Sequence, residues 1–153
     1  MKFFTVHQPW AALLAHGEKQ FETRTWQTGY TGPIAIHAGR TFNPDVIRLC
    51  RDQPFKDALE RHGIRSWEDL PLGAIVGVAN MVACHATELV TPTNQERAFG
   101  NWQPARFAWE LTDAIPLVVP IPFRGQLSLF ELPDNILEQL KRGLACQGYT
   151  YAQ

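Results

Sequence analysis

The 153-residue chain has almost no excess charge of either sign. Fourteen Lys and Arg residues face fifteen Asp and Glu residues, so the formal net charge is −1. A protein that holds nucleic acid by charge alone usually presents a strongly basic face. The composition therefore excludes that class but leaves room for a small, focused site. Long-range steering of phosphate groups towards this chain should be weak.

Long apolar runs and paired cysteines are also missing. No stretch approaches the roughly 20 apolar residues that a membrane-spanning helix needs, and the first residues lack the apolar core of a signal peptide. The three cysteines, Cys50, Cys84 and Cys146, are widely spaced and form no CxxC pair. We interpret them as free thiols in a reducing compartment. A cytoplasmic protein with no membrane contact is expected.

Motifs for metals and cofactors are absent from the sequence. The His and Cys spacings match no zinc pattern, the acidic residues show no pairing typical of metal sites, and no glycine-rich phosphate loop occurs. We predict no metal and no cofactor. Cys84 and His85 look like a nucleophile and a base, but adjacent strand residues point to opposite faces, so we reject them as a dyad.

What is present indicates an α+β fold. Eleven prolines, eleven glycines and nine phenylalanines favour many turns and β structure over a helical bundle. The length suits one domain, predicted over 1–143, with a loose tail at 144–153. The sequence predicts a small mixed β-barrel or strongly bent sheet. Its expected strands are 2–6, 19–26, 34–38, 74–83, 105–113, 115–119 and 127–132.

Helices are expected around this sheet. Pro9 suits the first position of a short helix and Gly17 the residue just past its end. Since its body is apolar almost all round, that helix should plug the sheet or barrel. The 43–63 segment is predicted as a charged helical insertion interrupted at Pro54. A final helix over 134–142 should stop before Gly143.

The first candidate site element is Gln8-Pro9-Trp10. A helix that begins at Pro9 leaves free amide groups beside the positive end of its dipole, which favours an anion or a carbonyl. Gln8 adds an amide that both donates and accepts, and a base can stack on Trp10. The alternative is that Trp10 belongs to the core and the helix end is merely hydrated.

The second candidate element is the polar strand from Lys19 to Trp26. Alternation places Glu22, Arg24 and Trp26 on one face and makes Phe21 the inward apolar residue of the other. The direction of Lys19 depends on the turn after Gly17. These residues form either a substrate-gripping group, with Lys19 as a base if burial lowers its pKa, or a solvated face with a weak ion pair.

Three further residues are candidates on their own. His37 lies on the 34–38 strand, where a lone histidine is more often a hydrogen-bonded core residue than a catalyst. Glu96 lies in the long 91–104 segment, and long loops in compact domains are often functional. Arg106 alternates with Trp109, so at most one of them lines any given cavity.

Taken together in order, these motifs resemble the ASCH domain family, which is grouped with PUA domains, and most closely its stand-alone bacterial and phage members. The resemblance spans roughly residues 3 to 132. It rests on Gln8-Pro9-Trp10-Ala11, the Lys19 to Trp26 strand, Tyr30-x-Gly32-Pro33-Ile34-x-Ile36-His37-Ala38, 72–77, 96–100, 106–109 and 120–125.

The resemblance implies a PUA-like barrel with a short helix over its mouth, and a cleft for RNA or a nucleotide around Lys19, Glu22 and Arg24. Family members have been described as nucleic-acid binders, as a ribonuclease, and as an amidohydrolase of N4-acetylcytidine. The amidohydrolase pattern uses a lysine, a threonine three residues later and a separate glutamate. Lys19 matches the lysine and Glu96 is a candidate glutamate, but Glu22 stands at the threonine position.

Three functions follow, in the order in which we favour them. The first is binding of RNA or a modified nucleotide, with Trp10 or Trp26 stacking a base, and Lys19 and Arg24 holding phosphate. The second is hydrolysis of RNA or an acylated nucleoside, with Lys19 as base and Glu22 as acid or water-orienting group. The third is a protein partner docked on the 43–63 segment. We expect a monomer.

Overall fold

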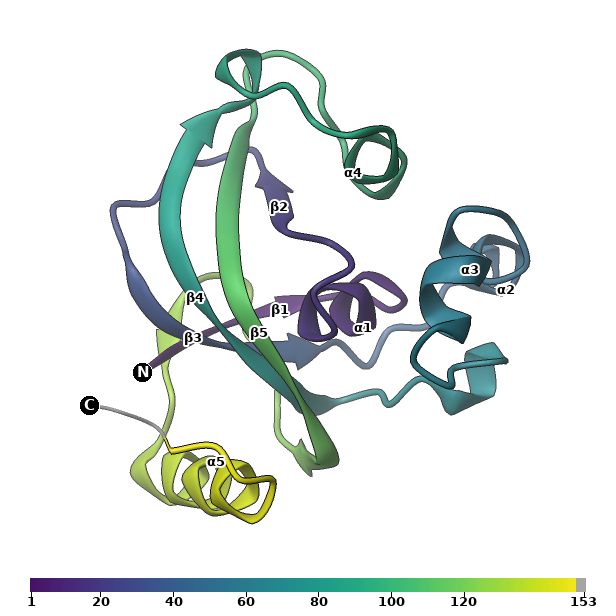
Figure 1. The fold of residues 1–153 in the computed structure, drawn as a ribbon. Helices are drawn as coiled ribbons and strands as arrows, with labels where there is room; N and C mark the ends of the chain where they lie inside the picture. The colour runs from purple at the N-terminus through teal and green to yellow at the C-terminus, as the bar shows by residue number, and fades with distance from the viewer. Residues whose placement is uncertain (151–153) are drawn as a thin grey trace.

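The computed structural model describes residues 1–150, which form one curved mixed sheet with helices on both sides (Figure 1). Its six strands lie in the order β2-β5-β4-β3-β1-β6. This confirms the α+β class. The strands are β1 (Lys2–Val6), β2 (Phe21–Arg24), β3 (Gly32–Ala38), β4 (Ala74–Ala86), β5 (Phe107–Pro122) and β6 (Phe130–Glu131).

The sheet is strongly bent but does not close into a barrel. The long strands β4 and β5 arch over the helices of one side (Figure 1). β3, β4 and β5 pair antiparallel, β1 pairs parallel to β3, and β2 and β6 form the two edges. Of the two expected forms, a small barrel or a strongly bent sheet, the structure has the bent, open sheet. Each edge strand is short and pairs with one neighbour only, so nothing joins the two edges.

The short helix α1 (Trp10–Ala15) fills the concave side of the sheet, as its apolar sequence predicts. Its residues Ala11 to Ala15 are all buried. A Cβ atom added at Gly77 of β4 would lie 2.8 Å from the Cβ of Ala15 and 2.8 Å from the carbonyl oxygen of Ile115. Gly77 therefore lets α1 approach the backbone of the sheet.

The predicted 43–63 insertion folds as two short helices, α2 (Asp45–Leu49) and α3 (Phe55–Glu60), with Pro54 at the start of the second. A short 3₁₀ turn, η1 (Trp67–Asp69), leads on to β4. Phe55, Ala58 and Leu59 pack with Leu13 of α1 and with Phe99 of α4 (Asn94–Phe99). The insertion is thus docked onto the core.

Two predicted strands are one strand in the structure. β5 runs from Phe107 to Pro122, although 105–113 and 115–119 were predicted to be separate. Val76 alone lies opposite residues 117–120, so β5 bulges there. The bulge accommodates Pro120, because a proline cannot donate to a regular ladder. The last predicted strand, 127–132, is reduced to the two residues of β6.

The C-terminal helix α5 (Asp134–Cys146) is longer than predicted. Its apolar face continues past Gly143, since Ile136, Leu140 and Leu144 follow a helical spacing and are all buried. Residues 144–146 of the predicted loose tail are therefore helical, and 151–153 lie outside the described residues. The side-chain amide of Gln147 accepts from the Val118 amide at 3.0 Å and donates to the Pro116 carbonyl at 2.8 Å.

Helices long and apolar enough to cross a membrane do not occur within residues 1–150. The described cysteines Cys50, Cys84 and Cys146 are all free.

Candidate functional site

A cavity of about 640 Å³ opens between the edge strand β2 and the helices α1, α3 and α4. Segments far apart in the sequence contribute its walls, including the turn before β2, the insertion and the loop after β5. The lining residues are Thr5, Val6, His7, Trp10, Lys19, Glu22, Thr23, Arg24, Leu49, Phe55, Ala98, Phe99, Gly100, Asn101, Arg106, Gln126 and Leu127.

Lys19 points into this cavity, as the family resemblance implies. The turn after α1 fixes it, because its backbone amide donates to the Leu13 carbonyl at 3.0 Å. The side chain is only 2% exposed, and its ammonium donates to the carbonyl of Phe21. Burial lowers the pKa of Lys19, while the carboxylates of Glu22 and Glu96 act in the opposite direction.

Glu22 and Arg24 share a face of β2, which confirms the alternation predicted for this pair. Arg24 Nε lies 2.9 Å from Glu22 Oε1, and Arg24 Nη2 donates to the Thr5 carbonyl at 2.7 Å. The guanidinium also lies 5.6 Å from the ring centre of Trp109. Both partners are largely buried, so the geometry of this pair is fixed before any ligand arrives.

The prediction that Phe21 is the inward residue of β2 is wrong. Phe21 is half-buried, and it packs edge-to-face on Trp102 with ring centres 5.6 Å apart. Glu22 and Thr23 are the buried residues instead. Because β2 is a short edge strand with only β5 beside it, consecutive residues reach the cavity from the open edge.

Arg106 adds a further cation to the cavity. Its Nη2 donates to the Thr23 carbonyl at 3.1 Å, whereas its buried Nε has no hydrogen-bond partner within residues 1–150. Trp109 is fully buried in the core, so only Arg106 of the two lines the cavity, as predicted. A buried donor without a partner is rare in folded proteins.

Trp10 lines the cavity, whereas Gln8 and Pro9, which precede it, do not. Gln8 is 2% exposed; its Oε1 accepts from the Ala12 amide at 3.0 Å and its Nε2 donates to the Pro71 carbonyl at 2.9 Å. Both ends of the Gln8 amide are therefore engaged within the protein. Pro9 precedes α1, and its carbonyl accepts from the Leu13 amide.

Trp26, although predicted as a stacking platform, lies outside the cavity lining. It packs edge-to-face on Trp109, with ring centres 4.7 Å apart.

His37 is also outside the lining and positions the loop at the cavity mouth. Its Nε2 donates to the Phe123 carbonyl at 2.7 Å, so its Nδ1, 3.2 Å from Thr5 Oγ1, is free to accept from that hydroxyl. The same Oγ1 accepts from the Gln126 amide at 3.1 Å. Burial lowers the pKa of His37, which favours this neutral arrangement.

Glu96 lies behind the cavity wall rather than on it. Its carboxylate accepts from the backbone amides of Gln20 at 2.7 Å and Phe21 at 3.3 Å, which ties α4 to the start of β2. Burial raises the pKa of Glu96, opposed by these hydrogen bonds and by Lys19. Glu96 thus influences the cavity through Lys19.

Several lining residues escaped the sequence analysis. Gly100 packs so closely that a Cβ atom there would lie 3.4 Å from Lys19 Nζ and 3.5 Å from Thr23 Oγ1. Leu49 and Phe55 come from the insertion predicted to be peripheral. The only sequence signal for them was the presence of large apolar residues in an otherwise charged segment. No group of three or more His, Cys, Asp or Glu side chains that could hold a metal ion occurs within residues 1–150.

Comparison with known families connects this geometry to other proteins. The ASCH domain profile matches residues 4–121. The chain belongs to the ASCH domain family. This domain has a PUA-like fold that is associated with RNA binding.

Two named proteins resemble the chain over most of its length. Activating signal cointegrator 1 of Homo sapiens is 26% identical over 143 residues, which cover 94% of this chain but 24% of that protein. The Mus musculus protein of the same name is 26% identical over 144 residues, again 94% of this chain and 24% of the relative. This ASCH domain thus spans about a quarter of these relatives.

Solved ASCH structures share the fold. The crystal structure of ASCH from Zymomonas mobilis superposes with a TM-score of 0.54 at 17% identity, over 91% of this chain and 92% of that chain. A tyrosine-to-phenylalanine mutant of the same Zymomonas mobilis protein gives a TM-score of 0.54 at 16% identity, over 91% and 94%. At this identity the likeness extends to the fold alone.

Proposed function

We propose that this ASCH domain binds RNA or a modified nucleotide in the cavity beside β2. The observation that carries the proposal is the convergence of Lys19, Arg24 and Arg106 with the half-buried ring of Trp10 on one cavity. Its volume of about 640 Å³ lies within the range of roughly 300–1,000 Å³ typical of small-molecule sites. A single nucleotide, free or at one position of a strand, suits that size.

The chemistry of the lining supports the proposal. The cationic groups of Lys19, Arg24 and Arg106 line the cavity and complement phosphate. Trp10 provides an apolar ring for a base, a mode that is typical of single-stranded RNA recognition. Since the net charge is −1, binding depends on these few contacts rather than on a basic surface.

A titration tests this proposal. We expect the wild-type protein to bind short single-stranded RNA or a nucleoside monophosphate at low salt, measured by calorimetry. Arg106→Gln should weaken binding by at least about 10-fold, because a charge-assisted contact contributes about 1.5–3 kcal/mol. Arg97→Gln is the matched control, since Arg97 is exposed on α4 and outside the cavity, and should bind like the wild type.

Two outcomes would contradict the proposal. If folded wild-type protein binds neither short RNA nor nucleotides at low salt, the cavity serves another ligand. If both arginine variants weaken binding equally, the effect is one of overall charge and the cavity is not the site.

A hydrolase is the second candidate function, favoured by the burial of Lys19. A lysine with a lowered pKa inside a cavity is suited to act as a general base. Glu22 stands where the amidohydrolase pattern has threonine, but the hydroxyl of the next residue, Thr23, also lines this cavity. In this alternative Lys19 activates a hydroxyl or a water molecule, and Glu22 orients it.

Chromatographic assay of acetylcytidine and of single-stranded RNA separates the two candidates. Hydrolysis requires a product whose formation is abolished by Lys19→Met in a protein that still folds. Binding without any product in a sensitive assay leaves the binding function alone.

A further inference from the structure

The α2–α3 segment, which looks like an appendage in the sequence, supplies one wall of the cavity. Leu49 at the end of α2 and Phe55 at the start of α3 both line it. The lysine and arginine residues of the lining lie elsewhere, on or before β2 and just before β5. The cavity therefore has a cationic end near the sheet and an apolar end against the insertion.

Aromatic packing defines the apolar end. The ring of Phe55 stands edge-on to Trp10, with ring centres 6.2 Å apart and an interplanar angle of 88°. It also packs on Phe99 of α4, with ring centres 4.8 Å apart. Leu49 is half-buried against the same cluster. A flat apolar ring that covers this surface removes apolar area from water, which favours binding.

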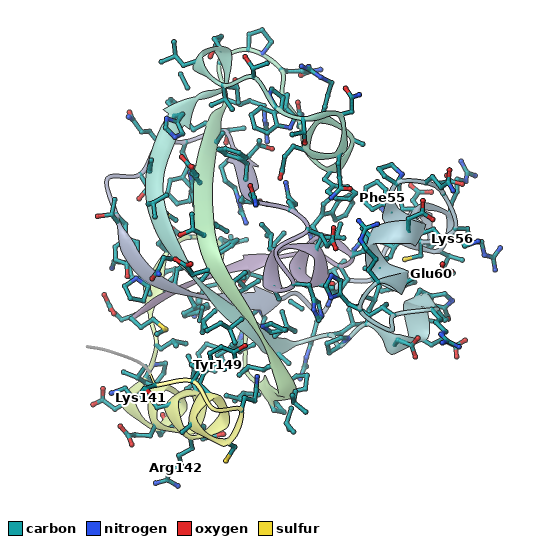
Figure 2. The ribbon with its side chains drawn as sticks, in the orientation of Figure 1. Phe55, Lys56, Glu60, Lys141, Arg142 and Tyr149 are labelled. Atoms are coloured by element: carbon teal, nitrogen blue, oxygen red, sulfur yellow. The ribbon has the colours of Figure 1, made fainter. Side chains whose placement is uncertain are left out.

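The insertion is held in place from its other end. Figure 2 shows Phe55 directed from α3 towards α1 and α4, with Lys56 and Glu60 on the outer side of the helix. Just beyond α3, Arg61 Nη2 donates to Glu18 Oε2 at 2.8 Å, and His62 Nε2 lies 2.8 Å from Glu18 Oε1. Glu18 directly precedes Lys19, so its carboxylate links the segment after α3 to the turn that carries Lys19.

We propose that the α2–α3 segment is the specificity element of this ASCH domain. It selects ligands in which an aromatic ring is joined to an anionic group: the ring lies against Trp10, Leu49 and Phe55, and the anion lies at Arg24 and Arg106. This inference rests on the proposed function and adds an orientation to it. The chemical class is a nucleoside monophosphate or one nucleotide of a strand.

Two probes that differ only in the ring test the orientation. Adenosine 5′-monophosphate carries both groups, whereas ribose 5-phosphate carries the anion without the base. Leu49→Trp fills the apolar end and should lower the affinity for the nucleotide at least 10-fold. Its affinity for ribose 5-phosphate should stay within 2-fold of the wild-type value. Ile47→Trp is the matched control, because Ile47 lies on the same helix outside the cavity lining.

A second variant guards against a folding defect. Leu49→Ala keeps the cavity open but removes apolar contact. It should weaken binding of the nucleotide by about 4- to 15-fold, as expected for one or two buried methylenes. Thermal melting of both variants checks that each one is folded. The affinity for ribose 5-phosphate should again remain unchanged.

Each remaining outcome overturns the inference. Equal losses for both probes, or no loss for the nucleotide in either Leu49 variant, mean that the segment does not receive the ring. If wild-type protein binds the nucleotide but Arg106→Gln does not weaken it, the assigned anion end is wrong. If folded wild-type protein binds neither of these two probes nor short single-stranded RNA, the proposed function itself is refuted, a result distinct from the others.

Discussion

Lys19 shows how one buried side chain sets the character of a cavity. An amine with a single backbone acceptor and two carboxylates nearby is neither fully solvated nor fully paired. Its proton is therefore held less firmly than in water. The lowered pKa of Lys19 should therefore make the free energy of unfolding depend on pH.

We predict that the free energy of unfolding of the wild-type protein rises relative to Lys19→Met as the pH increases from neutrality towards 10.5. The unfolded chain keeps the Lys19 proton up to its ordinary pKa of 10.5, whereas the folded chain releases it earlier. Stability rises with pH wherever the unfolded state binds more protons, by up to about 1.4 kcal/mol per pH unit. Urea denaturation across this range measures the difference, and parallel curves for the two proteins would contradict it.

For single residues, the sequence predicted which neighbours on a strand pair with each other, but not the tertiary contacts around them. Alternation along a strand is enough to place Glu22 beside Arg24. It cannot reveal that Gln8 engages both amide atoms inside the protein, because Pro71 is distant in sequence. Nor does it reveal Gly100, where an added Cβ atom would lie 3.0 Å from Trp102 Nε1 and 3.4 Å from Lys19 Nζ. Such effects depend on tertiary contacts rather than on local pattern.

Helix α1 and strand β4 illustrate the scale of secondary structure elements. The helix is six residues long and cannot be stable alone, so its position depends on its seat against the sheet. The helix packs most tightly at Gly77 of β4, where there is no room for a Cβ atom beside Ala15. Movement of α1 would displace Trp10 at one end and the turn that carries Lys19 at the other.

We predict that Gly77→Ala destabilises the protein by about 1–3 kcal/mol, because overpacking of a tight contact forces backbone shifts. Gly29→Ala is the control: its added Cβ meets nothing within 4 Å, and its stability should stay within about 1 kcal/mol of the wild type. Chemical denaturation of both variants provides the comparison. If the two glycines prove equally tolerant, α1 does not rest on this contact.

Elements were predicted best where a local signal was strong. Pro9 and Gly17 bracket α1, and Pro54 marks the break within the insertion, because proline and glycine act on the backbone directly. β5 was predicted as two separate strands, 105–113 and 115–119, and its continuation to Pro122 was not predicted. The structure absorbs Pro120 in a bulge, a solution that depends on the partner strand and is invisible in β5 itself.

For the whole molecule, Glu18 joins three regions that are far apart in the sequence. Its carboxylate accepts from Arg61 and His62 beyond α3, and from Gln95 of α4 at 3.2 Å. The hydrogen bond from Arg61, supported by those from His62 and Gln95, lowers the pKa of Glu18 to about 2. His16 stacks on His62 with ring centres 4.4 Å apart, next to the same carboxylate.

We predict that Glu18→Gln lowers the free energy of unfolding by about 1–2 kcal/mol at neutral pH, through the loss of charge-assisted hydrogen bonds that solvent partly screens. A depressed carboxyl pKa stabilises the folded state above pH 4.5, and this contribution is lost as the pH falls from 4.5 to about 2. The gap between wild type and variant in urea denaturation should therefore close over that range. Glu60→Gln, an exposed carboxylate on α3, is the control and should follow the wild type; a gap that persists at about pH 2 would contradict this role.

Fold class and family were within reach of the sequence at this scale, whereas the choice between a closed barrel and an open, bent sheet was not. Closure depends on whether two edge strands meet, and β2 and β6 are too short to signal it. The sequence also did not predict the apolar end of the cavity, because Leu49 and Phe55 lie in a segment whose charge made it look peripheral.

The Gln147 side chain has a bearing on how copies of this chain behave in concentrated solution. Val118 and Val119 are 79% and 76% exposed on a bulged part of β5, and bare apolar strand is a common nucleus for amyloid-like stacking. At this point the Val118 amide and the Pro116 carbonyl are already taken by the Gln147 amide. An invading strand would find those two backbone groups occupied, so we expect Gln147 to hinder the addition of a strand at this point.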